Sequence, residues 1–108
     1  MTTFDKREEG FEKQFAHDEE LKFRSIARRN KLLGLWAAQK LGIVGAEADA
    51  YAKEVVAAEF GEFGEGGDVF HKIRLDFDDK GVTVSDHQIR RTMDELLAKA
   101  VAEIKAGK

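Results

Sequence analysis

Cysteine and proline are both absent from the 108 residues of this chain. Without cysteine, the chain can form neither a disulfide framework nor a thiolate metal site. Long apolar runs are missing as well, since none approaches the roughly 18 residues that a membrane-spanning helix needs. The N-terminus, from Met1 to Asp5, lacks the basic and apolar regions of a secretion signal. We therefore expect a cytoplasmic protein that does not insert directly into a membrane.

A large net charge is also missing, because 18 basic residues stand against 21 acidic ones and leave a charge of only -3. This balance argues against nucleic acid as a partner, which usually requires a basic footprint. Apolar residues make up 43% of the chain and charged residues 36%. This length and composition predict one small domain, with a core beneath a heavily charged surface.

No constellation typical of catalysis or metal binding is present. The serines lie in no nucleophile motif, and the carboxylates are spread along the chain without a recognisable acid–base pair. The histidines fall in different segments and have no partner at metal-ligand spacing: His17, His71 and His87. The glycine-rich stretch 61–67 lacks the Gly-Lys-Ser/Thr ending of a phosphate loop and carries carboxylates instead. We predict a non-enzyme without a metal site, and a flexible linker at 61–67.

The apolar residues that are present recur at helical spacing between glycines. The strongest pattern predicts a helix from about Ser85 to Ala106, with Ser85 and Gln88 forming a capping box at its start. Its apolar face comprises Ile89, Met93, Leu96, Leu97, Ala100, Val101 and Ile104. Four glycines that follow helical patterns are predicted left-handed C-caps: Gly42, Gly61, Gly81 and Gly107.

Three further amphipathic segments complete the predicted all-α, four-helix bundle of residues 19–108. The longest runs from about Asp18 to Leu41 and carries Phe23, Ile26, Ala27, Leu33, Trp36, Ala37 and Leu41. The next carries Ala48, Tyr51, Ala52, Val55, Val56 and Phe60. A shorter one carries Val69, Phe70, Ile73 and Phe77, with Asp68 as its N-cap. The stretch from Phe77 to Val84 leaves a hairpin-like turn open as the alternative to helix there.

Residues 1–18 have a different pattern from the rest. Phe4, Phe11 and Phe15 would share a narrow arc of a helix, but that arc continues into the charged residues Asp18 and Lys22. Such a short helix is marginal in water. The pattern by itself leaves two interpretations open, and one is a mobile segment that folds when a groove accepts its phenylalanines. The alternative is that the three rings pack onto the bundle as an N-terminal extension.

A stripe of cations and one aromatic residue crosses the longest segment. Helical spacing places Lys22, Arg29, Trp36 and Lys40 on one face. Guanidinium against phosphate and indole against a base could hold a nucleotide such as ADP or ATP. The alternative is that Trp36 belongs to the core and that the long cations flank it.

Several strings in the first forty residues are similar to one known family. They are Phe4-Asp5-Lys6-Arg7-Glu8, Phe15-Ala16-His17-Asp18, and the run from Ala27 to Ala38, A-R-R-N-K-L-L-G-L-W-A-A. Together with the length, the glycine-punctuated middle and the amphipathic last segment, they resemble the zeta-subunit inhibitors of alphaproteobacterial ATP synthases.

The resemblance implies a four-helix bundle whose N-terminus inhibits ATP hydrolysis by the catalytic sector of ATP synthase. Residues 1–18 would enter an interface between catalytic subunits as a helix, which places the protein at the inner membrane through its partner. The apolar anchors would be Phe4, Phe11 and Phe15, and charge pairing by Asp5, Arg7 and Glu8 would set the register. ADP or ATP is implied as a regulatory ligand, no cofactor is required, and the free protein is expected to be a monomer.

Overall fold

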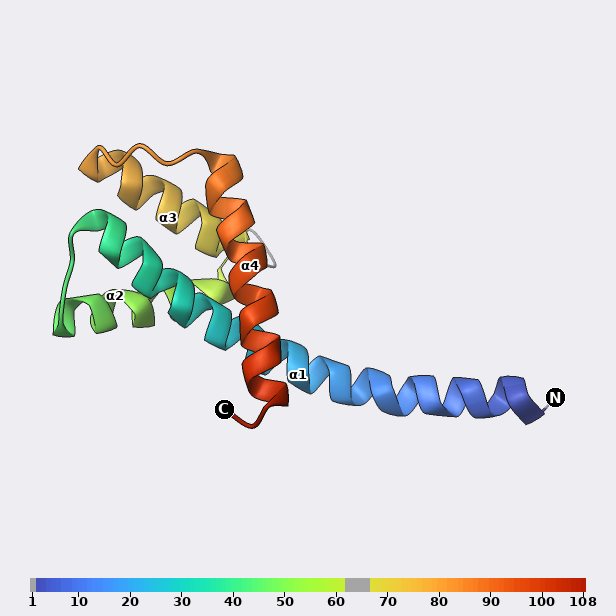
Figure 1. Cartoon of the computed structure of the whole chain (residues 1–108). Helices are drawn as coiled ribbons and strands as arrows, with labels where there is room; N and C mark the ends of the chain where they lie inside the picture. Colours follow the sequence, from blue (N-terminus) through green and yellow to red (C-terminus); the bar gives the residue numbers. More distant parts are fainter. Residues whose placement is uncertain (1, 62–66) are drawn as a thin grey trace.

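The computed structural model describes the backbone of residues 2–61 and 67–108, and the side chains of residues 19–61 and 67–108. The helices follow one another in this order: α1 (Thr2–Leu41), α2 (Ala46–Ala57), the 3₁₀ turn η1 (Ala58–Phe60), α3 (Gly67–Lys80) and α4 (Asp86–Lys105). The described backbone contains no strand. The predicted all-α, four-helix arrangement is therefore confirmed (Figure 1).

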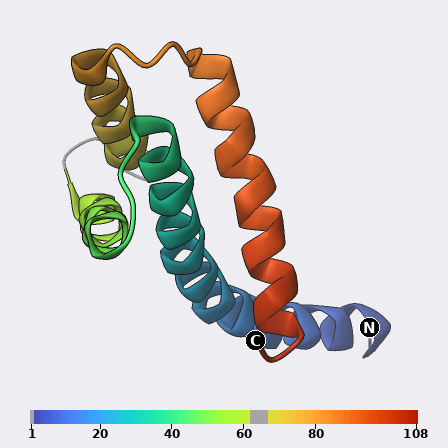
Figure 2. The same cartoon turned by 60° about the vertical axis from the view of Figure 1, so that its left-hand side comes forward.

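Helix α1 is the element on which the others assemble, because α2 and α4 both pack along its second half. Figure 2 shows α1 and α4 side by side, with α2 and α3 on the other flank of α1 and α3 above α2. The core lies where the four helices meet. Its buried members are Leu33, Ala37, Ala38, Tyr51, Val55, Val69, Ile73, Phe77, Val84, Ile89 and Met93.

Small residues on α1 allow α2 to approach closely. Gly34 faces α2, and a Cβ atom added to it would lie 2.6 Å from the Cα of Ala52. Ala37 and Ala38, one turn further along, are fully buried. The larger Trp36 is partly buried and sets its ring edge-on to Phe77 of α3, with ring centroids 5.7 Å apart. Trp36 is thus part of the core. This agrees with the alternative interpretation of its stripe, in which Trp36 belongs to the core and the long cations flank it.

The predicted last helix is confirmed to within one residue at each end. Ser85 is its N-cap, and the Ser85 hydroxyl accepts a hydrogen bond of 3.0 Å from the backbone N–H of Gln88. The left-handed conformation is also confirmed at three of the predicted glycine caps: Gly42, Gly81 and Gly107. These glycines end helices where any other residue would be strained.

The third helix is confirmed, but two details of its surroundings were predicted wrongly. Asp68 is not the N-cap, since α3 already begins at Gly67 and Asp68 lies in its first turn. Gly61 is not a left-handed cap, because its φ is -88°. The carboxylate of Asp68 occupies the space where a Cβ of Gly61 would lie. Gly61 therefore provides room for Asp68, and the hairpin alternative is replaced by helix up to Lys80.

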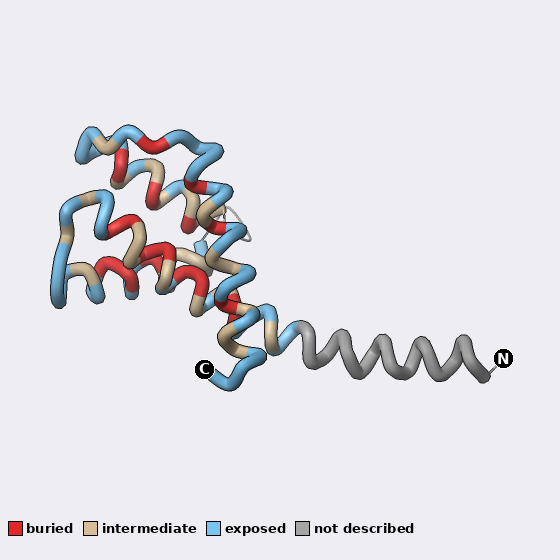
Figure 3. Tube along the Cα trace, in the orientation of Figure 1, coloured by how far each residue is buried: buried red, intermediate tan, exposed pale blue. Residues whose placement is uncertain are grey.

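Three residues assigned to apolar faces are exposed. Phe23 and Ala27 belong to the early part of α1, and Phe60 ends η1. Figure 3 shows that, among the described side chains of α1, most of the buried ones lie in the part among the other helices. Helical spacing identifies one face of a helix correctly, but it does not say how far along that face a neighbour extends.

Candidate functional site

The predicted partner-binding side chains belong to the first part of α1 and lie outside the described residues: Phe4, Asp5, Arg7, Glu8, Phe11 and Phe15. Their roles stay predictions, as does the boundary between residues 18 and 19, which falls within the bounds of α1. The described side chains begin at Glu19, directly after this segment.

A buried polar cluster joins α1 to η1 near that point. The guanidinium of Arg29 donates two hydrogen bonds to Oδ1 of Asn30, at 3.1 and 3.0 Å. It also forms an ion pair of 3.3 Å with Oε1 of Glu59, and that same oxygen accepts a bond of 2.8 Å from Nδ2 of Asn30. Asn30 is fully buried and Arg29 nearly so. Each of the three side chains thus forms a hydrogen bond or an ion pair with both of the others.

Burial lowers the pKa of Arg29 below its ordinary value, and the charges of Glu59 and then Asp94 oppose that shift. An arginine pKa is high enough that the guanidinium stays charged at ordinary pH. Its charge must therefore be balanced in place, and Glu59 is the carboxylate in direct contact. The cluster holds η1 against α1 at a defined angle.

The predicted nucleotide stripe does not gather around one cavity in the described structure. Arg29 is engaged with Asn30 and Glu59, and Trp36 packs against Phe77. Lys22 and Lys40 are exposed at either end of the stripe. Binding of ADP or ATP stays a prediction, since a phosphate would have to compete with Glu59 for Arg29.

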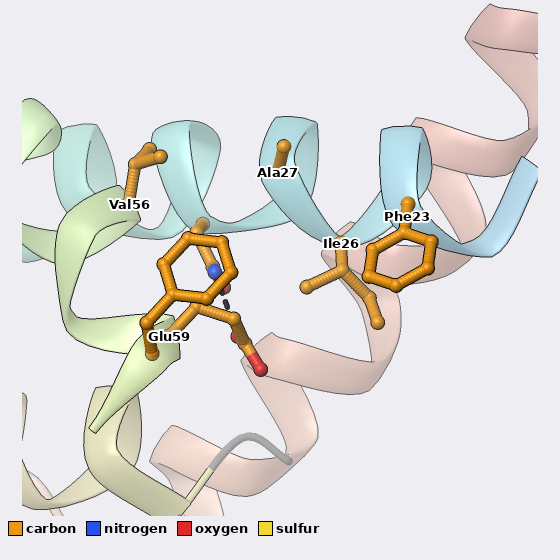
Figure 4. Close-up of a pocket in the computed structure, with 7 residues that line it drawn as sticks. Phe23, Ile26, Ala27, Val56 and Glu59 are labelled. Carbon is orange, nitrogen blue, oxygen red and sulfur yellow. Dashed lines mark hydrogen bonds between the residues drawn. The ribbon is translucent and has the colours of Figure 1, made fainter. Parts of the chain in front are cut away.

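An apolar pocket of about 250 Å³ opens beside the cluster, between α1 and η1 (Figure 4). Its walls come from α1 and from the end of α2 with η1: Phe23, Ile26, Ala27, Asn30, Val56, Glu59 and Phe60. In Figure 4, Phe23 and Ile26 lie on one side, and Glu59, bonded to Asn30, lies opposite. Phe23 is 71% exposed and Phe60 is 84% exposed.

A second, broader hollow of about 560 Å³ adjoins this pocket and shares Val56 and Phe60 with it. Lys31 and Lys53 stand on its sides together with Asp49. The described side chains thus form a continuous apolar surface from Phe23 across Val56 to Ala52, with cations along one stretch.

The sequence patterns pointed to Arg29 but missed its partners. Glu59 and Asn30 lie 29 positions apart, so no local spacing links them. One signal for these partners was available. Asn30 lies on a helix face otherwise lined by apolar residues, and a buried asparagine requires a hydrogen-bonding partner. The sequence patterns identified Phe60 as a residue of an apolar face, but they wrongly placed it in the core.

Among the described residues, no group of three histidine, cysteine, aspartate or glutamate side chains could hold a metal ion. No helix in the same part of the chain has the length and apolarity to span a membrane. Taken together, the fold and these surfaces define a small helical bundle with an apolar pocket between α1 and η1.

The comparisons assign a family to this bundle. A family model described as ATPase inhibitor subunit zeta matches residues 1–103, and the chain belongs to this family. A solution NMR structure is 41% identical in sequence and similar in fold, with a TM-score of 0.71. That likeness covers 82% of this chain and 99% of the solved one. A comparison with curated proteins gives no match.

The resemblance found in the sequence is therefore confirmed. Membership in an inhibitor family supports a role as an ATP synthase inhibitor, with ATP synthase as the partner and a regulatory rather than a catalytic function.

Proposed function

We propose that this chain inhibits ATP hydrolysis by inserting residues 1–18, as a helix, into an interface between catalytic subunits of ATP synthase. The observation that carries the proposal is the family match, which starts at residue 1 and so includes this segment. The arc of Phe4, Phe11 and Phe15 on a segment with few other apolar residues supports it. An apolar arc of this kind is typical of helices that bind in grooves.

The chemistry of the insertion follows from the side chains of the segment. Burying each phenylalanine ring contributes about 1.5–3 kcal/mol, which offsets the cost of ordering the segment. Asp5, Arg7 and Glu8 would pair with opposite charges of the interface and thereby set the register of the helix. Wedged between subunits, the helix would oppose rotation in the hydrolytic direction, whereas rotation during synthesis would expel it.

The test measures ATP hydrolysis by a purified catalytic sector of a matching ATP synthase as inhibitor is added. The full chain should lower the rate, and a chain carrying Phe11→Ser and Phe15→Ser should lose at least about tenfold in potency. The matched control is Val44→Ser, which alters an exposed apolar residue in the connection after α1. Insertion by this segment is wrong if the double variant inhibits as well as the full chain does.

The location and the oligomeric state belong to the same proposal. A chain that acts in this way lies on the cytoplasmic side of the inner membrane, held there by ATP synthase, and it enters the interface as a monomer. Sedimentation of the free protein at the concentrations used for inhibition measures the oligomeric state directly.

A further inference from the structure

Two phenylalanine rings border one pocket and remain largely in water. Phe23 of α1 is 71% exposed and Phe60 of η1 is 84% exposed, and both line the 250 Å³ pocket beside Glu59. Exposed rings are costly to keep in water, and two at one hollow form a patch of the kind that marks a binding surface. The described chain provides nothing that covers them.

The interior of this pocket defines the chemistry of its occupant. Its two polar members, Asn30 and Glu59, are already bonded to each other and to Arg29. Because most of the lining is apolar, an incoming charged or strongly polar group would lose its water with little in return. The occupant must therefore be apolar, with the size of one leucine, methionine or phenylalanine side chain.

The rim adds a requirement of charge. Arg24 is exposed on the turn of α1 next to Phe23, and Lys31 and Lys53 line the adjoining hollow. None of these three forms an ion pair with another described side chain. Carboxylates lie nearby as well: Asp49 lines the same hollow, Glu59 of the pocket is paired with Arg29, and Glu19 and Glu20 are exposed on the turn before Phe23. The hollow itself carries two cations, Lys31 and Lys53, and a partner that presents carboxylates beside its apolar side chain would pair with them.

The position of the pocket on α1 identifies that partner. Phe23 follows Asp18, the end of the proposed inserted segment, by five residues of the same helix. At about 1.5 Å per helical residue, the pocket begins about 8 Å beyond the inserted segment. The surface that receives the segment must therefore face Phe23 as well.

We infer that this pocket is a second docking point on the catalytic sector of ATP synthase, where it takes one apolar side chain flanked by carboxylates. The inference rests on the proposed function and adds a surface of the bundle to it. The inserted segment blocks rotation, and the pocket holds the bundle at the mouth of the interface and raises affinity.

The alternatives are a second copy and the chain's own N-terminal segment. A second copy related by two-fold symmetry would bury the same two rings, and sedimentation detects it. The chain's own first eighteen residues would have to reverse direction between Asp18 and Phe23, where α1 is continuous.

The test compares three full-length proteins in the hydrolysis assay: the wild type, Phe23→Gln combined with Phe60→Ser, and the control Val44→Ser. Both variants replace only exposed side chains, so circular dichroism should record the same melting temperature for all three proteins. The pocket variant should need at least about tenfold more protein for half-maximal inhibition, which corresponds to about 1.4 kcal/mol. Its maximal inhibition should be unchanged, because the inserted segment is intact.

The outcomes separate this inference from the proposed function. If the pocket variant inhibits at the wild-type concentration while the Phe11 and Phe15 variant fails, insertion stands and the second docking point is wrong. If the Phe11 and Phe15 variant inhibits normally and the pocket variant fails, the docking point stands and insertion is wrong. A wild-type dimer that the pocket variant abolishes in sedimentation would assign the pocket to a second copy and overturn the inference.

Discussion

Two stretches of α1 both carry apolar residues at helical spacing and have opposite surroundings. From Arg29 to Ala38 the helix is enclosed by α2, α3 and α4, and its small residues admit α2 at close range. From Glu19 to Ala27 most side chains face water, Phe23 among them. The first stretch maintains the fold, and the second remains available to a partner. An amphipathic pattern by itself does not distinguish the two.

Among the variants that test this difference between the two stretches, Leu33→Ala should have the largest effect on stability. Leu33 is fully buried, so its truncation leaves a cavity and should lower the free energy of unfolding by about 2–5 kcal/mol. Phe23→Ala, ten residues earlier on the same helix, should change it by less than about 0.5 kcal/mol. Urea denaturation measures both. Equal losses would mean that the exposed stretch is also part of the core.

Glu59→Ala should have the next largest effect, because it removes the carboxylate that balances Arg29. The side chain of Arg29 is only 9% exposed, and losing its partner should cost about 2–3 kcal/mol. The control is Glu95→Ala, which breaks the exposed pair with Arg91 and should cost less than about 0.5 kcal/mol. If thermal melting shows the same small loss for both variants, the cluster does not hold η1 against α1.

Exchanging glycine and alanine should destabilise the fold in both stretches, but for different reasons. Ala27→Gly, at an exposed position, should destabilise by about 1 kcal/mol through helix propensity. Gly34→Ala gains that amount but forces a Cβ to within 2.6 Å of Ala52 Cα, and overpacking costs about 1–3 kcal/mol. We expect a net loss of about 1 kcal/mol, measured by urea denaturation. Stabilisation by Gly34→Ala would show that α2 moves away without cost.

The smallest effect concerns Tyr51, whose hydroxyl donates a hydrogen bond of 2.7 Å to Asp76 on α3. Burial, and then this bond, raise the pKa of Tyr51 above its ordinary value. The folded state therefore keeps the proton that the unfolded state releases above about pH 10, so this contribution to stability is complete below pH 10 and falls as pH rises. Tyr51→Phe should cost about 1 kcal/mol at pH 7.

The same pair of proteins gives the pH test. Tyr51 is the only tyrosine, so the difference in unfolding free energy between wild type and Tyr51→Phe isolates this group. The difference should shrink between pH 7 and pH 11. A constant difference would contradict a raised pKa.

Much of the fold could be predicted because it depends on local chemistry. The α4 pattern, its Ser85 cap and the glycine stops at Gly42 and Gly81 are set by residues within a few positions of one another. The prediction of a left-handed cap at Gly61 was wrong because the role of Gly61 depends on Asp68, a residue of helix α3. The site was less predictable for the same reason, since Arg29 and Phe60 could be identified but their surroundings could not.

By itself, the sequence determined where helices form and end and which face of each is apolar, since helix propensity, capping and 3.6-residue spacing act within one segment. It also carried the family resemblance, since this depends on strings of residues. Only the tertiary structure decided that Arg29 is held by Glu59 and that Phe23 and Phe60 border one pocket. These outcomes depend on how α2 and η1 cross α1, and that crossing is set by contacts between residues far apart in the chain.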